Sequence, residues 1–228
     1  MTTERDRLID AALEHVIFDG MSEKAVLAGA RDIGMSPHLA HVHLPRAGLD
    51  LAAAYHRRGD AALRQWLATT PLQGRFRDRI TDAVMHRLTL SNREMARAGA
   101  VTLALPQNAA LGARLIWETT DAVWEGLGDN SQDVNWYSKR ATLSTVYGAT
   151  VLYWLGDDSP EMDDTRAFLD RRIEGVMRFE KIKGRLGSLP GVGTLAGFAT
   201  GWIRRPTRSS SPGSLRDRTL PEAERGDA

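Results

Sequence analysis

The sequence predicts an all-α protein, and three observations carry this prediction. Apolar residues recur at the 3.6-residue spacing of amphipathic helices along most of the chain, and the strict alternation typical of strands is nearly absent. Residues that begin helices (Ser, Asn, Pro) and residues that end them (Gly, Pro) stand between these segments. The 228 residues are 42% hydrophobic, which is enough for a sizeable core.

The first 60 residues are expected to form a three-helix head and the start of a fourth helix. Gly20 ends the first apolar periodic segment, and Ser22 can cap the second. The pair Ser36-Pro37 is typical of an N-cap followed by proline at the first helical position. The expected helices are 4–18, 23–33, 37–44 and 48–69.

Residues 61–187 are expected to form a larger helical domain. Residues 151–155 are apolar nearly all round, so the helix that carries them should be buried on most sides. Residues 128–131 and 156–160 have the composition of turns and loops. Beyond 48–69, the expected helices are 76–97, 109–127 with Asn108 as its cap, 134–155 and 163–187, and a short apolar piece, 101–105, lies between the first two.

Composition and charge exclude several classes of protein. There are 30 basic and 29 acidic residues, so the net charge of +1 does not favour a general polyanion binder. The absence of cysteine excludes disulfides, thiolate nucleophiles and cysteine zinc sites. No segment reaches the roughly 20 apolar residues of a membrane-spanning helix. The first residues resemble neither a secretory signal nor a transit peptide, so we expect a bacterial cytoplasmic protein.

No set of residues predicts catalysis. His38 and His41 lie one helical turn apart and could share a metal ion, and His43 is close in sequence. No carboxylate completes a familiar ligand set, so the alternative is that these are ordinary polar or partly buried histidines. There is also no activated serine motif and no glycine-rich phosphate loop after a strand. We therefore expect no enzyme activity, no metal and no cofactor.

The N-terminal helices resemble the DNA-binding head of the TetR regulator family, through residues 11–15 and the turn at 34–36. In that family basic residues around the third helix hold DNA phosphates. Residues 33–45 contain no lysine or arginine, and residues 1–60 hold seven basic and nine acidic side chains. We therefore expect no nucleic-acid binding. The alternative reading of the chain is a TetR-family transcriptional regulator with a lipophilic effector.

Two adjacent aromatic residues, Trp136 and Tyr137, stand at the start of an expected helix. Adjacent helical residues point about 100° apart, so both are not expected in the core. One of them should reach the surface, where tryptophan and tyrosine favour interfaces. The alternative is that one fills a gap between helices and the other lies flat on a loop.

The segment 115–180 closely resembles the Coq-nine family of accessory proteins of ubiquinone biosynthesis, and the resemblance extends weakly over residues 5–205. Its most specific part is the Asn-Trp-Tyr piece with its spacing to Asp-Ser-Pro. The matching pieces are Leu105-Pro106-Gln107-Asn108, Val123-Trp124, Asp133-Val134-Asn135-Trp136-Tyr137, Arg140-Ala141, Val146-Tyr147 and Asp157-Asp158-Ser159-Pro160 with Phe168-Leu169.

The resemblance implies a TetR-like fold adapted to bind an isoprenoid lipid or a phospholipid in a pocket of the larger domain. It implies docking onto the demethoxyubiquinone hydroxylase, a di-iron enzyme, through Val123, Trp136 and Tyr137. His86 departs from an apolar position at the edge of that patch. TetR-like proteins usually pair through their late helices, so a homodimer is expected. Along helix 134–155 we assign the pocket to Val146, Tyr147, Val151, Leu152 and Trp154.

Residues 188–205 are expected to form an amphipathic helix that contacts a membrane. On a helical wheel of 192–203, the apolar residues fall on one side and only glycine and threonine on the other. Such a helix is weak in water, because each glycine costs about 1 kcal/mol relative to alanine, and an interface would stabilise it. The alternative is close packing against another helix through glycines at four-residue spacing. The expected contact residues are Leu195, Phe198, Trp202, Ile203, Arg204 and Arg205.

Basic residues flank this segment. Residues 178–208 contain seven basic side chains and one acidic one, a net charge of +6. Basic residues near an anionic bilayer contribute about 1 kcal/mol each to binding. We expect the protein to lie at the cytoplasmic face of the inner membrane, with residues 206–228 as a disordered tail.

Overall fold

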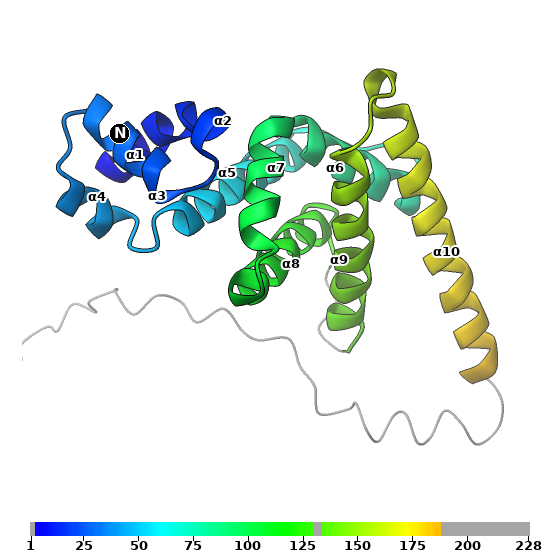
Figure 1. Ribbon diagram of the computed structural model, residues 1–228. Coiled ribbons are helices and arrows are strands. Elements are labelled where there is room, and N and C mark those ends of the chain that lie inside the picture. Colours follow the sequence, from blue (N-terminus) through cyan, green and yellow to red (C-terminus); the bar gives the residue numbers. More distant parts are fainter. Residues whose placement is uncertain (1–2, 130–133, 188–228) are drawn as a thin grey trace, which may run out of the picture.

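The computed structural model describes residues 3–129 and 134–187 and confirms the all-α prediction (Figure 1). Two predicted segments, 188–205 and 206–228, lie outside the described residues. In the part described, no helix is long and apolar enough to cross a membrane. The helices are α1 Glu4–Glu14, α2 Val16–Asp19, α3 Glu23–Asp32, α4 Pro37–His43, α5 Gly48–Thr69, α6 Phe76–Thr89, α7 Arg93–Leu103, α8 Ala109–Gly126, α9 Val134–Trp154 and α10 Asp163–Gly187, with short 3₁₀ turns at Pro106–Asn108 and Pro160–Met162.

The head of the protein is built as its local sequence predicts. Ser22 and Ser36 are the N-caps of α3 and α4, and each side chain accepts a hydrogen bond from a backbone N–H in the first turn, of Ala25 and Leu39 respectively. Helices α1 and α3 pack closely because Gly29 has no side chain. A Cβ at Gly29 would lie 2.6 Å from the Cα of Ala12.

Two predicted helices are each divided in the structure. The segment 4–18 breaks at His15 into α1 and α2. The segment 76–97 ends at Thr89, and α7 begins at Arg93, because the side chain of Asn92 caps a new helix by accepting from the N–H of Met95. Asn108 occupies the N-cap position of α8 as predicted, but its side chain makes no capping hydrogen bond, and its amide instead donates to the carbonyl of Thr102 at 2.9 Å.

Helix α5 runs from the head into the larger helical body (Figure 1) and contributes to a hydrophobic core in each. Its first half contributes Leu51 to the core of the head, and its second half contributes Leu63 and Leu67 to the core of the larger helical body. The boundary expected at residue 60 therefore falls inside one continuous helix.

The loop between α9 and α10 is organised by Asp157, a buried residue. Its carboxylate accepts hydrogen bonds from the backbone N–H of Ser159 at 2.8 Å and of Thr165 at 2.9 Å, and from the hydroxyl of Thr165. Burial acts to raise the pKa of Asp157, but these hydrogen bonds outweigh it and lower the pKa from 3.8 to about 2.

We expect Asp157→Asn to lower the free energy of unfolding at neutral pH and to make that free energy depend less on pH in the acid range. A depressed carboxyl pKa contributes stability above the unfolded-state value of 3.8, and this contribution is lost as the pH falls toward about 2. Urea unfolding across that range should show a smaller pH slope for the variant. Asp158→Asn, at the exposed neighbouring position, serves as the control, and equal slopes for wild type and Asp157→Asn would contradict this role.

Candidate functional site

A cavity of about 400 Å³ lies in the helical body between α5, α7, α8 and α9. Its size falls within the range of small-molecule sites. Gly99 of α7 is buried in its wall, and a Cβ added there would meet no atom within 4 Å, so this glycine faces empty space. Small side chains leave the space open between the helices. They are Ala96, Gly99 and Ala100 of α7, and Ala109, Gly112 and Ala113 of α8.

The structure places four of the five predicted pocket residues in this wall: Tyr147, Val151, Leu152 and Trp154. Leu152 is 71% exposed and lies at the mouth, whereas Trp154 is buried. Adjacent residues of a helix point about 100° apart. Because Tyr147 faces this cavity, its neighbour Val146 faces another side of α9. There Val146 lines a second hollow of about 570 Å³ between α6, α8, α9 and α10.

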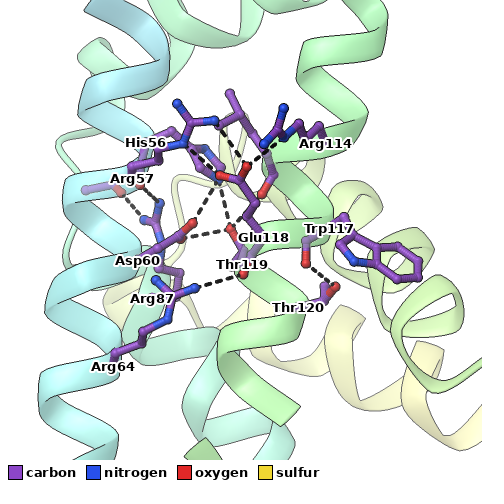
Figure 2. Close-up of polar contacts among 12 residues, drawn as sticks. His56, Arg57, Asp60, Arg64, Arg87, Arg114, Trp117, Glu118, Thr119 and Thr120 are labelled. Atoms are coloured by element: carbon purple, nitrogen blue, oxygen red, sulfur yellow. Dashed lines mark hydrogen bonds and ion pairs between the residues drawn. The ribbon is translucent and has the colours of Figure 1, made fainter. Parts of the chain in front are cut away.

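A buried polar network, drawn in Figure 2, adjoins the cavity on the side of α5 and α6. Its members His56, Arg87 and Ser91 line the cavity, whereas Asp60 and Thr119 are not part of the lining. Arg87 Nε donates to Asp60 Oδ1 at 2.8 Å, and both side chains are almost fully buried. The other two guanidinium nitrogens donate to the backbone carbonyl of His56 at 2.9 Å and to the hydroxyl of Ser91 at 2.7 Å. Thr119 of α8 donates to the same Asp60 oxygen at 2.8 Å. Three helices are thereby tied together around the cavity.

A second, solvent-facing pair of arginines lies beside this network in Figure 2. Arg57 Nε donates to Glu118 at 2.7 Å, and Arg114 Nε donates to the same carboxylate at 3.0 Å. The hydrogen bond from Arg57 is the main reason why the pKa of Glu118 is lowered. Because the arginine side chains are 45% and 72% exposed, these ion pairs contribute little to stability.

Two titratable residues of the cavity wall, His56 and Tyr147, are uncharged at neutral pH. Burial lowers the pKa of His56 and raises the pKa of Tyr147. The hydroxyl hydrogen of Thr119 goes to Asp60, so the 2.8 Å contact between Thr119 and His56 is donated by His56 Nε2. His56 is therefore the Nε2–H tautomer, with Nδ1 as an acceptor.

An aromatic cluster, Trp117, Trp136 and Tyr137, joins α8 to the start of α9. Trp136 packs edge to face on Tyr137 with ring centres 4.7 Å apart, and Trp117 lies 6.0 Å from Trp136 and 6.4 Å from Tyr137. Trp136 is 6% exposed and Tyr137 is half-buried. The expectation that at least one of the adjacent pair reaches solvent agrees with this arrangement.

Burial corrects two of the three predicted docking residues. Val123 is 1% exposed and belongs to the core of the body, because it shares the inward face of α8 with Ala122 and Leu115. Trp136 is enclosed by its aromatic neighbours and by Arg140, whose guanidinium lies 4.1 Å from the centre of its ring. Of the three, Tyr137 alone presents part of its side chain at the surface of the described chain.

Arg140 anchors the aromatic cluster. This fully buried arginine donates to Asp121 of α8 and, at 3.0 Å, to Asp129 after α8, and it also donates to the carbonyl of Trp136 at 3.2 Å. It thereby fixes the first turn of α9 against α8 on either side of residues 130–133. The position of Tyr137 thus depends on this arginine as well as on packing.

The other predicted positions lie away from the cavity. His86 stacks on Trp66, with ring centres 3.9 Å apart. His41 and His43 each face a carboxylate of another helix, Glu23 and Glu4. In the described ranges, no group of three His, Asp or Glu side chains is placed to hold a metal ion. The predicted membrane-contact residues Leu195, Phe198, Trp202, Ile203, Arg204 and Arg205 lie outside the described residues.

Several residues of these sites were not found from the sequence, among them His56, Arg87 and Trp117. The signal for Trp117 was its place off the apolar face of its helix, which carries Ile116, Thr120 and Val123. A large aromatic residue off that face needs a contact from another element, and Trp136 and Tyr137 provide it.

Comparisons with known proteins agree with this architecture. The family model described as COQ9 matches residues 109–180, which include the aromatic cluster and most of α8, α9 and α10. The chain is 31% identical over 181 residues to "Ubiquinone biosynthesis protein COQ9, mitochondrial" of Rattus norvegicus, covering 75% of this chain and 58% of that protein. The Schizosaccharomyces pombe protein of the same description is 28% identical over 173 residues, covering 73% of this chain and 67% of that protein. The match thus spans less than two thirds of the rat protein.

A solved structure shows the same fold. "Crystal structure of the TetR transcriptional regulator from Nitrosomonas europaea ATCC 19718" matches with a TM-score of 0.55 and 20% identity, covering 75% of this chain and 95% of that one. At this identity the likeness is one of fold alone. It confirms the TetR-like arrangement predicted from the N-terminal helices.

Proposed function

Because this chain belongs to the COQ9 family, we propose that it is a lipid-binding accessory protein of ubiquinone biosynthesis that presents a quinone intermediate to an enzyme at a membrane surface. In this proposal the protein binds and presents the lipid and carries out no chemical step itself. Each CH₂ group of a prenyl tail costs about 0.8 kcal/mol when exposed to water, so an enzyme benefits from a partner that shelters part of the tail.

The cavity beside α9 is the observation that carries this proposal. It is bounded by small apolar residues, Leu152 at its mouth is 71% exposed, and its far wall holds buried polar groups. A space of about 400 Å³ suits a ring and the first part of a tail, with the remainder leaving past Leu152. Mass spectrometry of an organic extract of the purified protein should find an isoprenoid lipid, and a protein free of lipid would argue against this function.

The partner in this proposal is the demethoxyubiquinone hydroxylase, and its contact surface centres on Tyr137. The support is the similarity of residues 109–180 to the COQ9 family, together with the partial exposure of Tyr137 beside two packed tryptophans. A rigid aromatic group that is half-buried loses little conformational freedom on binding, which suits a binding hot spot.

Membrane contact in this proposal is made by residues 188–205, which lie outside the described residues. The double substitution Phe198→Asp and Trp202→Asp should abolish co-sedimentation with anionic liposomes, because it places two charges on the apolar side of the wheel. Binding of the wild type should weaken as salt is raised, since the +6 flank is screened.

The matched control is Thr194→Asp with Thr200→Asp, which adds the same two charges on the opposite side of the wheel. This control should retain most of the binding at moderate salt. If Phe198→Asp with Trp202→Asp sediments like the wild type, the segment is a packing element and the membrane role is lost.

A further inference from the structure

The second hollow, of about 570 Å³ between α6, α8, α9 and α10, is separate from the cavity. Among the described residues, the two linings have no member in common. The side chains around this hollow are largely apolar and partly open to solvent: Phe76 is 39% exposed, and Leu127 and Val176 are half-buried. Apolar surface that stays in contact with water favours an apolar occupant.

The register of α9 and α10 shows how far the hollow extends along them. The two helices are antiparallel (Figure 1), and Tyr153 of α9 stacks on Phe168 of α10 with ring centres 4.5 Å apart. The lining stretch 138–146 of α9 therefore lies level with about residues 175–183 of α10. The hollow thus extends toward the end of α10 at Gly187, from which the rest of the chain continues.

The segment 192–203 has the length and the pattern to return along this stretch. As the helix that its wheel predicts, it spans about 18 Å, close to the distance along α10 from Gly187 back to Val176. Pro190 and Gly191 stand just before it and favour a reversal of the chain. Its apolar side matches the hollow, and the side of glycine and threonine is suited to face water.

Charges at the end of the returning helix agree with this placement. Arg204 and Arg205 directly follow the segment and reach the level of Glu174 on α10. The side chain of Glu174 is 51% exposed and already pairs with Arg178 at 2.7 Å. Exposed pairs of this kind are weak, so they favour the orientation of the helix while the apolar contact supplies most of the binding.

From these observations we infer that residues 192–203 dock as a helix into the second hollow when the protein is in solution, with their apolar side against Phe76, Leu127 and Val176. The same apolar side is the one proposed to contact the membrane, so the two positions exclude each other. The helix leaves the hollow only where a bilayer binds it more strongly. The competition rests on the proposed membrane contact, whereas the docking itself does not.

The test is a pair of introduced cysteines, which reports the contact cleanly because the full chain has no cysteine of its own. Val176→Cys lies in the hollow, and Ile203→Cys lies level with it on the apolar side of the returning helix. Under mild oxidation this pair should form an intramolecular disulfide at least tenfold faster than the control pair, Val176→Cys with Gly201→Cys. Gly201 points about 200° away from Ile203, and a disulfide needs Cβ atoms about 4 Å apart.

Vesicles of phosphatidylcholine and phosphatidylglycerol test the competition. They should slow the disulfide of Val176→Cys with Ile203→Cys at least threefold, because they hold the helix outside the hollow. The oxidised protein should no longer co-sediment with the vesicles, and reduction should restore its binding. The reduced form is a control of identical sequence, and non-reducing electrophoresis with intact-mass measurement identifies the product.

Equal disulfide rates for the two cysteine pairs would overturn the inference. A main product with the mass of two chains would also overturn it, since a second copy would then cover the hollow. An oxidised protein that sediments as well as its reduced form would overturn the competition. If the wild type does not bind vesicles while the intramolecular disulfide still forms at the expected rate, the docking stands and the proposed membrane contact fails.

Discussion

Replacing Arg87 with methionine should lower the free energy of unfolding by about 3–5 kcal/mol, the usual cost of breaking one half of a buried ion pair. The substitution keeps much of the side-chain volume but leaves the carboxylate of Asp60 buried without its counter-charge, and it removes the donors to His56 and Ser91. Chemical denaturation followed by circular dichroism measures the effect.

Two controls separate charge from packing. Arg114→Met is the same substitution in the exposed pair with Glu118 and should cost less than about 1 kcal/mol. The double variant Arg87→Met with Asp60→Leu removes both charges and should recover a large part of the loss, since an apolar pair can replace a buried ion pair. A loss for Arg87→Met no greater than that of Arg114→Met would show that the buried pair is not a structural anchor.

Tyr137→Lys should lower the affinity for the demethoxyubiquinone hydroxylase about thirtyfold or more, which corresponds to the 2 kcal/mol expected for truncating an interface hot spot. A lysine removes the aromatic contact and brings a charge that must lose its water at an apolar interface. Co-purification from cells that express both proteins gives a first readout, and titration of the purified pair gives the affinity. The helical circular dichroism should be retained, because Tyr137 is only half-buried.

Tyr153→Lys is the matched control at the opposite end of α9 and should leave the affinity unchanged. Trp136→Lys differs from Tyr137→Lys in kind. Its side chain is 6% exposed and packs under Arg140, so it should destabilise the fold itself. A folded Tyr137→Lys protein that binds the hydroxylase as tightly as the wild type would place the docking surface elsewhere.

Most of the helices could be predicted from the sequence, because the residues that begin and end them act within one helical turn. Ser22 and the Ser36-Pro37 pair are caps that act within one turn, and the structure confirms both. The break at Asn92 was not predicted, because the apolar spacing continues across it and hides the cap. Periodicity reports which face is buried, and it does not report where a chain stops one helix and starts the next.

The candidate site likewise has residues that could be predicted from the sequence and residues that could not. Leu152 and Trp154 could be assigned from the segment 151–155, which is apolar nearly all round. Arg87 carried a signal too, since it stands on an apolar face with Val84 and Leu88, and a charge there requires a buried partner. Its partner Asp60 lies 27 positions away on another helix, and only the tertiary fold identifies it.

The central claim, that the cavity beside α9 holds a lipid, is tested most directly by the amount of lipid per protein in Gly99→Leu. Because a Cβ at Gly99 meets no atom within 4 Å, a leucine side chain can start there without a clash and extend into the cavity. The matched variant Gly175→Leu makes the same change on an exposed face of α10, where a Cβ also has no neighbour within 4 Å. Mass spectrometry of organic extracts should show that Gly99→Leu loses most of its lipid while Gly175→Leu retains it. Equal lipid in two folded variants would contradict the claim that the lipid lies in this cavity.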